Sequence, residues 1–214
     1  MPRQSPLQNR AAPDGGLHAV AAHGALMGNR GGRLHRADGT LGAARWVSRA
    51  WIACRLDFRG RHRQVMGESY TEIFFLDEAT ALAAGHRPCF ECRRADARAF
   101  AAAWARAAGL ARPPRAGEMD RVLHAGRLGA EERVARGALP AGTIFRLDAG
   151  LGCGFRLCGA DGLLAWSFEG YHPAADVPAG QPVVAVTPAS VRAVLAAGYR
   201  PDLHPSARDQ FSAR

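Results

Sequence analysis

The sequence predicts an α+β protein, in which a small zinc-binding α/β module is followed by a small, mainly antiparallel β-sheet subdomain with a C-terminal helix. Three observations support this prediction. A capped helix pattern follows a short apolar run near residue 75, two cysteines with a two-residue spacing come directly after that helix, and short strand patterns separated by turn residues follow beyond residue 140.

The composition is that of a globular protein with an excess of positive charge. The 214 residues are 48% hydrophobic and 22% charged, with a net charge of +9 and a pI near 10.5. The net charge lies in residues 1–139, because residues 140–214 carry six arginines and six acidic residues. This distribution favours a polyanion such as nucleic acid as partner, although an ordinary solvated basic surface has the same composition.

The sequence contains no sign of a membrane span or an export signal. No apolar run approaches the roughly 18 residues that a membrane helix needs, and the first residues lack the apolar stretch of a signal peptide. The five cysteines are an odd number, which argues against a disulfide framework. We therefore expect a cytoplasmic protein without membrane association, whose cysteines bind metal or pack as small apolar residues.

The first part of the chain divides into two segments. Residues 1–44 are Gly-rich, and we expect loops around one short strand at residues 17–21. The zinc-binding module covers residues 45–112. In it, the alternation over residues 46–56 favours a strand, and the run Ile73–Leu76 has the bulk and length of a buried strand.

The following elements are defined by their end signals. Asp77 is a suitable N-cap for a helix that continues to Ala84, Gly85 provides the left-handed position at its end, and Pro88 prevents the helix from resuming. A second helix is predicted over residues 95–108. Residues 116–204 form the α+β C-terminal subdomain, and residues 205–214 are expected to be a flexible tail. The predicted elements of the C-terminal subdomain are a polar helix at 118–128, strands at 143–147, 154–158, 163–168 and 183–186, and a helix at 190–197.

Cys89 and Cys92 have the C-x2-C spacing with which one backbone turn presents two thiolates to a tetrahedral ion. A redox-active pair has the same spacing, but it belongs at the start of a helix that follows a strand, whereas a helix is predicted immediately before this pair. Simple packing of the two cysteines is the other alternative. The sequence therefore predicts half of a zinc site.

The run Ala-Ala-Gly-His-Arg-Pro-Cys-Phe-Glu-Cys-Arg after the first helix resembles the zinc-binding segment of Ada-type DNA methylphosphotriester repair proteins. The resemblance covers about residues 54–109. In that family two further ligands come from an upstream C-x3-C pair, and one of them accepts a methyl group from DNA phosphate. Here the resemblance implies Zn²⁺ bound by Cys54, Cys89 and Cys92, with Cys54 also the candidate methyl acceptor.

The upstream pair of that family is incomplete in this chain, so the fourth ligand is open. His62 keeps the family's spacing to Cys89, and His86, Asp57 and His124 are the alternatives. A neutral imidazole in place of a thiolate removes one negative charge from the site, which lowers the nucleophilicity of Cys54. A structural or nucleic-acid-binding zinc site is therefore favoured over methyl transfer.

The sequence thus favours a zinc-binding protein that binds nucleic acid, with DNA preferred over RNA, through an arginine-rich surface. The expected phosphate-binding residues are Arg55, Arg59, Arg61, Arg63, Arg93, Arg94 and Arg98. An enzyme is the first alternative, either a methyl acceptor or a metal-assisted hydrolase or nuclease in which Asp120 and His124, one helical turn apart, act as acid and base. A module with structural zinc that binds a protein partner is the second.

Overall fold

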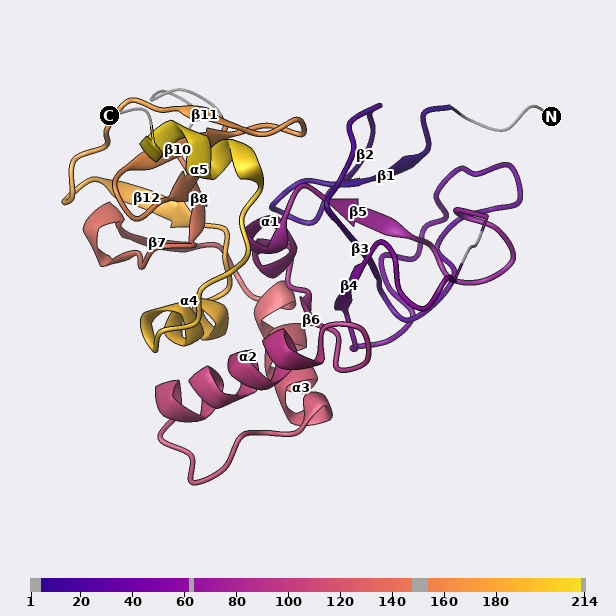
Figure 1. Ribbon diagram of the computed structural model, residues 1–214, viewed down its shortest axis with the longest axis horizontal. Coiled ribbons are helices and arrows are strands. Elements are labelled where there is room, and N and C mark those ends of the chain that lie inside the picture. Colours follow the sequence, from indigo (N-terminus) through magenta and orange to yellow (C-terminus); the bar gives the residue numbers. More distant parts are fainter. Residues whose placement is uncertain (1–4, 62–63, 148–153, 213–214) are drawn as a thin grey trace.

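The computed structural model describes residues 5–61, 64–147 and 154–212, and it has the predicted α+β content. The described residues form two six-stranded sheets, which lie on either side of helix α1 (Figure 1). The first sheet has the order β2-β1-β5-β3-β4-β6. Its strands are β1 (Gln8–Ala11), β2 (Leu17–Ala19), β3 (Leu26–Asn29), β4 (Ile52–Arg55), β5 (Ile73–Phe75) and β6 (Arg87–Pro88).

The N-terminal segment contributes three strands to this sheet, where the sequence indicated loops around a single strand. β3 lies between β5 and β4 and pairs antiparallel with both. The β1 and β3 sequences, QNRA and LMGN, carry little apolar alternation, so their extended form depends on the neighbouring strands. Gly28 in β3 is required by close packing, because a Cβ there would lie 2.4 Å from the carbonyl oxygen of Ile52. The strand predicted over residues 46–56 is shortened to β4.

The second sheet is antiparallel throughout, as the sequence predicted, and has the order β11-β10-β9-β8-β12-β7. Strands β8, β9, β10 and β12 match the predicted strands, whereas β7 and β11 were not predicted. The bounds are β7 (Glu132–Ala135), β8 (Ile144–Arg146), β9 (Phe155–Cys158), β10 (Leu163–Trp166), β11 (Tyr171–Pro173) and β12 (Pro182–Ala185). A short 3-10 helix, Arg136–Ala138, follows β7.

Helix α1 (Glu78–Ala83) begins and ends where the sequence signals placed it. The Asp77 side chain accepts a hydrogen bond from the backbone N–H of Thr80, and Gly85 has a φ of +80° just after the helix. All six residues of α1 are buried because the helix lies between the two sheets (Figure 1). This position packs Ala81 against the core of the first sheet and Ala79 against the core of the second.

Three further helices form a layer below the sheets in Figure 1: α2 (Arg94–Ala107), α3 (Ala116–Leu128) and α4 (Ala189–Ala196). Each lies within two residues of its predicted bounds. Their shared core is made of apolar side chains that are less than a tenth exposed, including Phe100 and Trp104 of α2, Leu123 of α3 and Val194 of α4. This layer supports the turn that carries Cys89 and Cys92, since α2 starts directly after that turn.

Residues 205–212 form helix α5 (Pro205–Ser212), where the sequence predicted a flexible tail. The helix is held by tertiary contacts with β11. The Ser206 hydroxyl accepts a hydrogen bond of 2.8 Å from the backbone N–H of Tyr171, and Ala207 is 1% exposed. A short sequence of mixed polarity cannot reveal such packing, because the apolar partner lies 35 residues away.

Glu78 joins the two halves of the chain at the start of α1. One of its carboxylate oxygens accepts a hydrogen bond from the Tyr199 hydroxyl at 2.7 Å, and the other accepts the backbone N–H of Asp202 at 2.9 Å. Arg93 adds an ion pair of 2.9 Å with the same carboxylate. Arg93, the residue that follows Cys92, is therefore connected through one buried carboxylate to the segment between α4 and α5.

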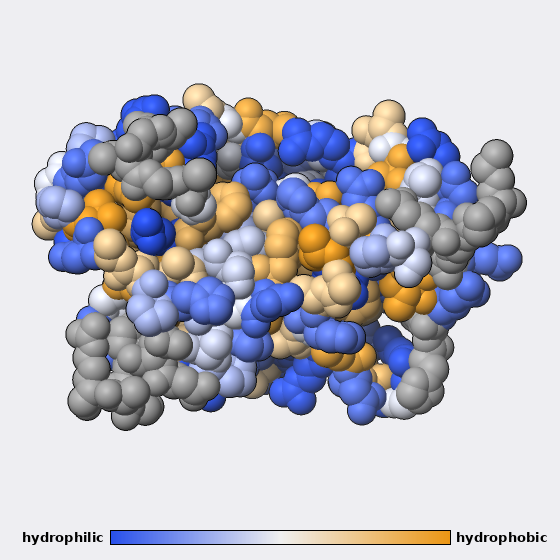
Figure 2. Space-filling view, turned by 90° about the horizontal axis from the view of Figure 1, so that it is seen from above, coloured by the Kyte–Doolittle hydropathy of each residue, from blue (hydrophilic) through white to orange (hydrophobic). Residues whose placement is uncertain are grey.

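The outer surface of the molecule is mixed in polarity. On the face shown in Figure 2, the hydrophobic residues are dispersed among hydrophilic ones. The most exposed large apolar side chains among the described residues are two on α3, Val122 and Leu128, and three in other segments, Val47, Leu56 and Leu110. None of the described helices combines the length and the apolar character needed to cross a bilayer.

Candidate metal centre

The pairing of β4 with β6 brings Cys54 next to Cys89. The two strands run parallel with Ala53 opposite Pro88, and the backbone N–H of Cys89 donates to the carbonyl oxygen of Ala53 at 3.0 Å. Pro88 favours an extended conformation for the residue before it, so the chain leaves α1 as a strand and not as a further helical turn. Two cysteines that are 35 positions apart in the sequence thereby become neighbours on one sheet.

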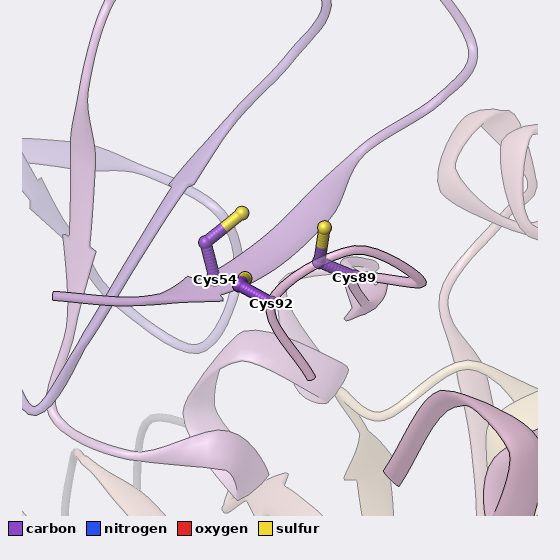
Figure 3. Close-up of side chains that lie close together, drawn as sticks. All are labelled: Cys54, Cys89 and Cys92. Atoms are coloured by element: carbon purple, nitrogen blue, oxygen red, sulfur yellow. The ribbon is translucent and has the colours of Figure 1, made fainter. Parts of the chain in front are cut away.

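Cys92 joins them through the turn that starts at Cys89. The backbone N–H of Arg93 donates to the carbonyl oxygen of Cys89 at 3.0 Å, and the N–H of Glu91 points at the Cys89 sulfur at 3.4 Å. The ligand atoms of the three cysteines all lie within 4.8 Å of one another (Figure 3). All three are free thiols.

This geometry fits a zinc ion. Zn–S bonds of about 2.3 Å in tetrahedral geometry place two sulfurs about 3.8 Å apart, so small side-chain movements suffice to coordinate one ion. Within the described ranges, this is the one group of three or more His, Cys, Asp and Glu side chains close enough to share an ion. The three cysteines therefore form a possible metal-binding cluster.

The pKa values of the three thiols shift in different directions. Hydrogen bonds from Cys54 and Cys92 lower the pKa of Cys89 to about 2. The hydrogen bond to Cys89 raises the pKa of Cys54 far above its usual value. The pKa of Cys92 is also raised, because the hydrogen bond to Cys89 and burial outweigh the lowering effect of Cys54. Full ionisation of all three thiols requires a cation among the sulfurs.

The structure removes one argument that the sequence offered against a redox pair. The turn from Cys89 to Cys92 does follow a strand, β6, and does precede a helix, α2, because the chain becomes extended again after α1. The third thiol now distinguishes the two alternatives. A disulfide between Cys89 and Cys92 would leave Cys54 beside it without a role, whereas a metal ion uses all three.

A cavity of about 440 Å³ opens onto the three cysteines. Its wall includes Glu72, which is 2% exposed and whose Oε2 accepts the backbone N–H of Met66 at 2.6 Å. Within the part of the chain that the structure describes, Glu72 Oε1 has no hydrogen-bond partner. A buried carboxylate oxygen without a donor beside an open metal-binding cluster is the arrangement expected where a ligand completes the site.

Sequence reasoning missed Glu72, although one signal was available. Glu72 and Phe74 are two residues apart on an extended segment, so their side chains share a face of the sheet. Phe74 is opposite Met27, and Met27 is opposite Cys54, which places Glu72 on the face that carries the thiol. The two-residue spacing alone does not place Glu72 near Cys54, because β5 and β4 are separated by β3 and the order of the strands must also be known.

The candidates for the fourth ligand lie in different places. His62 lies outside the described residues. His86 is buried in the aromatic core, with its ring 4.6 Å from that of Phe75 and 4.9 Å from that of Trp51, and Asp57 is exposed. His124 packs edge-on against Trp46 at 5.3 Å. None of the described candidates joins the cysteine cluster.

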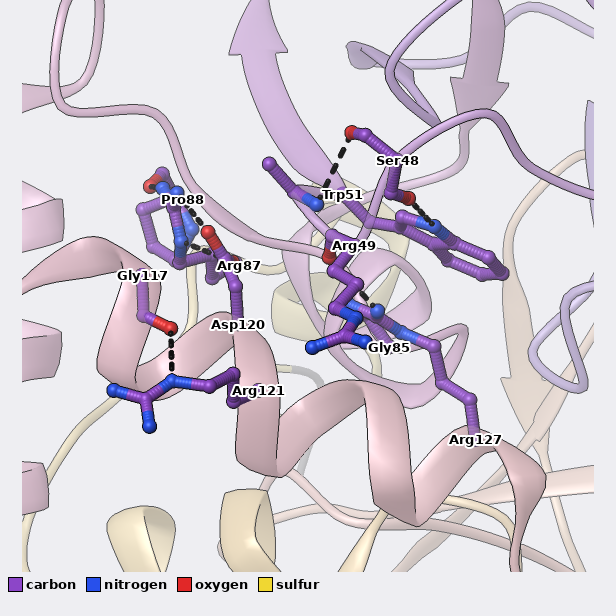
Figure 4. A network of polar contacts seen from close by, with 11 residues as sticks. Ser48, Arg49, Trp51, Gly85, Arg87, Pro88, Gly117, Asp120, Arg121 and Arg127 are labelled. Atoms are coloured by element: carbon purple, nitrogen blue, oxygen red, sulfur yellow. Dashed lines mark hydrogen bonds and ion pairs between the residues drawn. The ribbon is translucent and has the colours of Figure 1, made fainter.

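The carboxylate of Asp120 binds Arg87 and forms no hydrogen bond with His124 among the described residues. Its two carboxylate oxygens bind Nε and Nη2 of Arg87 at 2.8 and 2.9 Å, in a fork with less than a tenth of either side chain exposed (Figure 4). Asp120 and His124 do lie one turn apart on α3, but the hydrogen-bond partner of Asp120 is Arg87 on β6. This ion pair anchors the strand that leads into Cys89.

The predicted phosphate-binding arginines are divided between surface and core. Arg55, Arg59, Arg94 and Arg98 are exposed, and Arg61 is exposed and ion-paired with Glu91 at 2.7 Å. Arg93 is 4% exposed and binds Glu78 and Asp96, so its expected role on the surface is wrong. Arg63 lies outside the described residues.

Comparison with known proteins adds no family to this description. The sequence matches no family model, and no curated protein or solved structure is significantly similar to it. The likeness to Ada-type domains stays a prediction based on the residues of the turn and its flanking helices.

Proposed function

We propose that this chain is a zinc-binding protein that binds nucleic acid through the basic segment next to its three-cysteine cluster. The cluster is the observation that carries the proposal. Its three sulfurs supply the soft ligands that Zn²⁺ prefers, and the cavity in front of them leaves room for a fourth ligand.

The residues after Cys54 supply the proposed nucleic-acid surface. Arg55 and Arg61 line the same cavity as the cysteines, and Arg59 lies between them on the exposed segment. Arg55 and Arg59 form no ion pair with any described residue, so their charges are available to phosphate. Arg94 and Arg98 extend this surface along the first turns of α2. Phosphate contacts of this kind give salt-dependent affinity with little sequence preference.

His62 is our proposal for the fourth ligand. The residue before it, Arg61, pairs with Glu91, which lies between Cys89 and Cys92 in the metal turn. His62 follows Arg61 directly in the sequence, and a neutral imidazole nitrogen would complete a Cys3His site. We expect chelator competition to show weaker zinc binding in His62→Ala. Glu72→Gln should still bind one equivalent of Zn²⁺ per chain. Retention of full affinity in His62→Ala would assign the position to another group.

The test of the nucleic-acid proposal is a salt series. Fluorescence anisotropy of a labelled DNA duplex should show affinity that falls steeply between about 50 and 200 mM salt. Arg55→Ala with Arg59→Ala should lower the slope of log affinity against log salt by about 2, since each phosphate contact adds about 0.9. The matched control, Arg121→Ala with Arg208→Ala, removes two exposed charges elsewhere.

Two results would contradict this proposal. One is the absence of binding at low salt, and the other is an equal loss of slope in the control pair. A parallel series with RNA of the same sequence tests the expected preference for DNA. Chelated protein should lose affinity as well if the zinc centre positions the basic segment.

A second candidate function is methyl transfer to Cys54, and one observation favours it. Cys54 lines the open cavity, which offers a small group a route towards its sulfur. In such a transfer the sulfur would form an S–CH3 bond while an O–CH3 bond of a methylated phosphate breaks. Intact-protein mass after incubation with methylphosphotriester DNA decides the matter, because an unchanged mass rules transfer out.

A further inference from the structure

A second cavity, of about 350 Å³, lies where α3, the end of β12 and the segment before β4 meet. It shares no lining residue with the cavity at the cysteines. Four of its lining residues are arginines and two are tryptophans. They are Arg30, Arg45, Arg127, Arg146, Trp46 and Trp51.

Two guanidinium groups lie over the same tryptophan ring in this cavity. The Cζ atoms of Arg30 and Arg127 are 4.1 and 4.2 Å from the ring centroid of Trp51. The hydrogen bonds of both side chains go to backbone carbonyls. Arg30 Nη2 donates to the carbonyl oxygen of Gly15 at 2.7 Å. Arg127 donates to the carbonyl oxygen of Gly85 through Nε at 3.0 Å and through Nη2, and to that of Arg49 through Nη1 at 3.0 Å (Figure 4), so one N–H of each Nη remains for a ligand.

Neither guanidinium is neutralised by a carboxylate. Among the described residues, Arg30 and Arg127 form no ion pair. Arg30 is 3% exposed, and its buried Nε has no hydrogen-bond acceptor there. Burial lowers the pKa of Arg30 to about 9, with repulsion from Arg45 and Arg127 in the same direction, and burial lowers the pKa of Arg127 to about 10. Both pKa values are lowered mainly by burial, and neither side chain has a carboxylate partner among the described residues.

The acidic residues that line the cavity have partners other than Arg30 and Arg127. Glu131 pairs with Arg146, and Glu132 pairs with Arg192. Asp14 accepts the backbone N–H of Gly16 at 2.9 Å and only partly offsets the repulsion on Arg30. An oxyanion bound in the cavity beside Arg30 and Arg127 would supply the missing negative charge.

The size and lining of the cavity indicate which oxyanion fits. Guanidinium forks match the geometry of phosphate, and about 350 Å³ is at the small end of the range for ligand pockets, about 300–1,000 Å³. Trp46 is half-buried at the wall, with its ring 6.2 Å from that of Trp51, and offers an aromatic surface for stacking. We propose that this cavity binds a phosphate-bearing ligand of mononucleotide size, with the phosphate held by Arg30 and Arg127.

The phosphate has two possible sources, a free nucleotide or the 5′ end of a nucleic-acid strand, and the probes separate them. Isothermal titration of the full zinc-loaded chain would compare inorganic phosphate, AMP, adenosine and a short oligonucleotide with and without a 5′ phosphate. AMP should bind more tightly than phosphate, and adenosine should not bind. Tighter binding of the 5′-phosphorylated oligonucleotide than of AMP assigns the source to a strand end, and the reverse order assigns it to the free nucleotide.

Variants test the residues. Arg30→Gln should weaken AMP at least tenfold, Trp46→Leu should weaken AMP while leaving phosphate unchanged, and the control Arg208→Gln should change neither. A folded-state check comes from the rise in melting temperature that AMP causes in the wild type, which Arg127→Gln should abolish even if Arg30→Gln unfolds. The double variant Arg55→Ala with Arg59→Ala should still bind AMP. The AMP proposal therefore does not depend on the proposed binding of nucleic acid by Arg55 and Arg59.

Three results would overturn the proposal. They are the absence of binding by both AMP and inorganic phosphate at millimolar concentration, binding of adenosine as tight as that of AMP, and unchanged AMP affinity in folded Arg30→Gln or Arg127→Gln. A purely structural cation–π cluster would lower the melting temperature of these variants without any response to phosphate in the wild type.

Discussion

Replacement of Asp120 by asparagine tests whether this carboxylate supports the fold or performs chemistry. The two oxygens of Asp120 bind Arg87 at 2.8 and 2.9 Å, and both side chains are less than a tenth exposed. Asparagine keeps the shape but leaves the buried guanidinium without its counter-charge. Loss of one partner of a buried pair costs about 3–5 kcal/mol of unfolding free energy.

For a chain of this length, each kcal/mol corresponds to about 2–4 °C in melting temperature, so Asp120→Asn should lower the midpoint by about 6–20 °C. Urea unfolding of the zinc-saturated protein, followed by tryptophan fluorescence, gives the free energy directly. The double variant Arg87→Met with Asp120→Leu should lose less than Asp120→Asn alone, because replacement of both partners by apolar residues is often close to neutral.

His124→Ala is the comparison within the same helix. It should change the unfolding free energy by less than about 1 kcal/mol, since its ring makes an edge contact with Trp46 and lies near the surface. The structural interpretation is refuted if Asp120→Asn costs less than about 1 kcal/mol, or if the double variant loses as much as its two single variants together.

Three further predictions concern the metal, a histidine and a glycine. A chelator should lower the melting temperature of the wild type and of the control Cys158→Ala, whose thiol lies outside the cluster. It should not lower that of Cys89→Ser, because this variant should already lack metal. An equal effect on all three proteins would contradict the metal site. Burial, aided by Arg30 and Arg127, lowers the pKa of His86 well below 6.5, so the unfolded chain binds more protons and stability should fall below about pH 6.5 by up to about 1.4 kcal/mol per pH unit. His86→Phe should reduce this slope in urea unfolding measured from about pH 5 to 8, and an unchanged slope would show that other groups cause it. Gly28→Ala should cost about 1–3 kcal/mol, because its Cβ would meet the Ile52 carbonyl; full stability would show that β3 and β4 can separate easily.

Much of the fold could be predicted where end signals are local. The Asp77 cap, the positive φ of Gly85 and the break at Pro88 fix the ends of α1 within a few residues, so the sequence alone was sufficient there. The same is true of the strands of the second sheet that are separated by turn residues. The strands β1 and β3 and the helix α5 could not be predicted, because distant segments hold them in place.

The candidate site shows the same division. The spacing of Cys89 and Cys92 is a local motif, whereas Cys54 was placed by resemblance and its position beside Cys89 depends on the parallel pairing of β4 with β6. The position of Glu72 beside the cysteines depends on the strand order of the first sheet. The burial of Arg93 depends on its ion pair with Glu78, 15 positions away, which a count of charges along the sequence cannot show. Charge along the sequence identified a basic region but not which of its arginines face solvent.

The carboxylate of Glu78 has a consequence for how this chain can change in evolution. It binds Arg93, which follows the turn of Cys89 and Cys92, and two groups in the segment between α4 and α5, Tyr199 and Asp202. A recombination event that transplanted residues 45–112 into another protein would leave this buried carboxylate without its C-terminal partners. The two halves are therefore expected to be inherited together, with the cysteine cluster as a property of the whole chain and not of a transferable module.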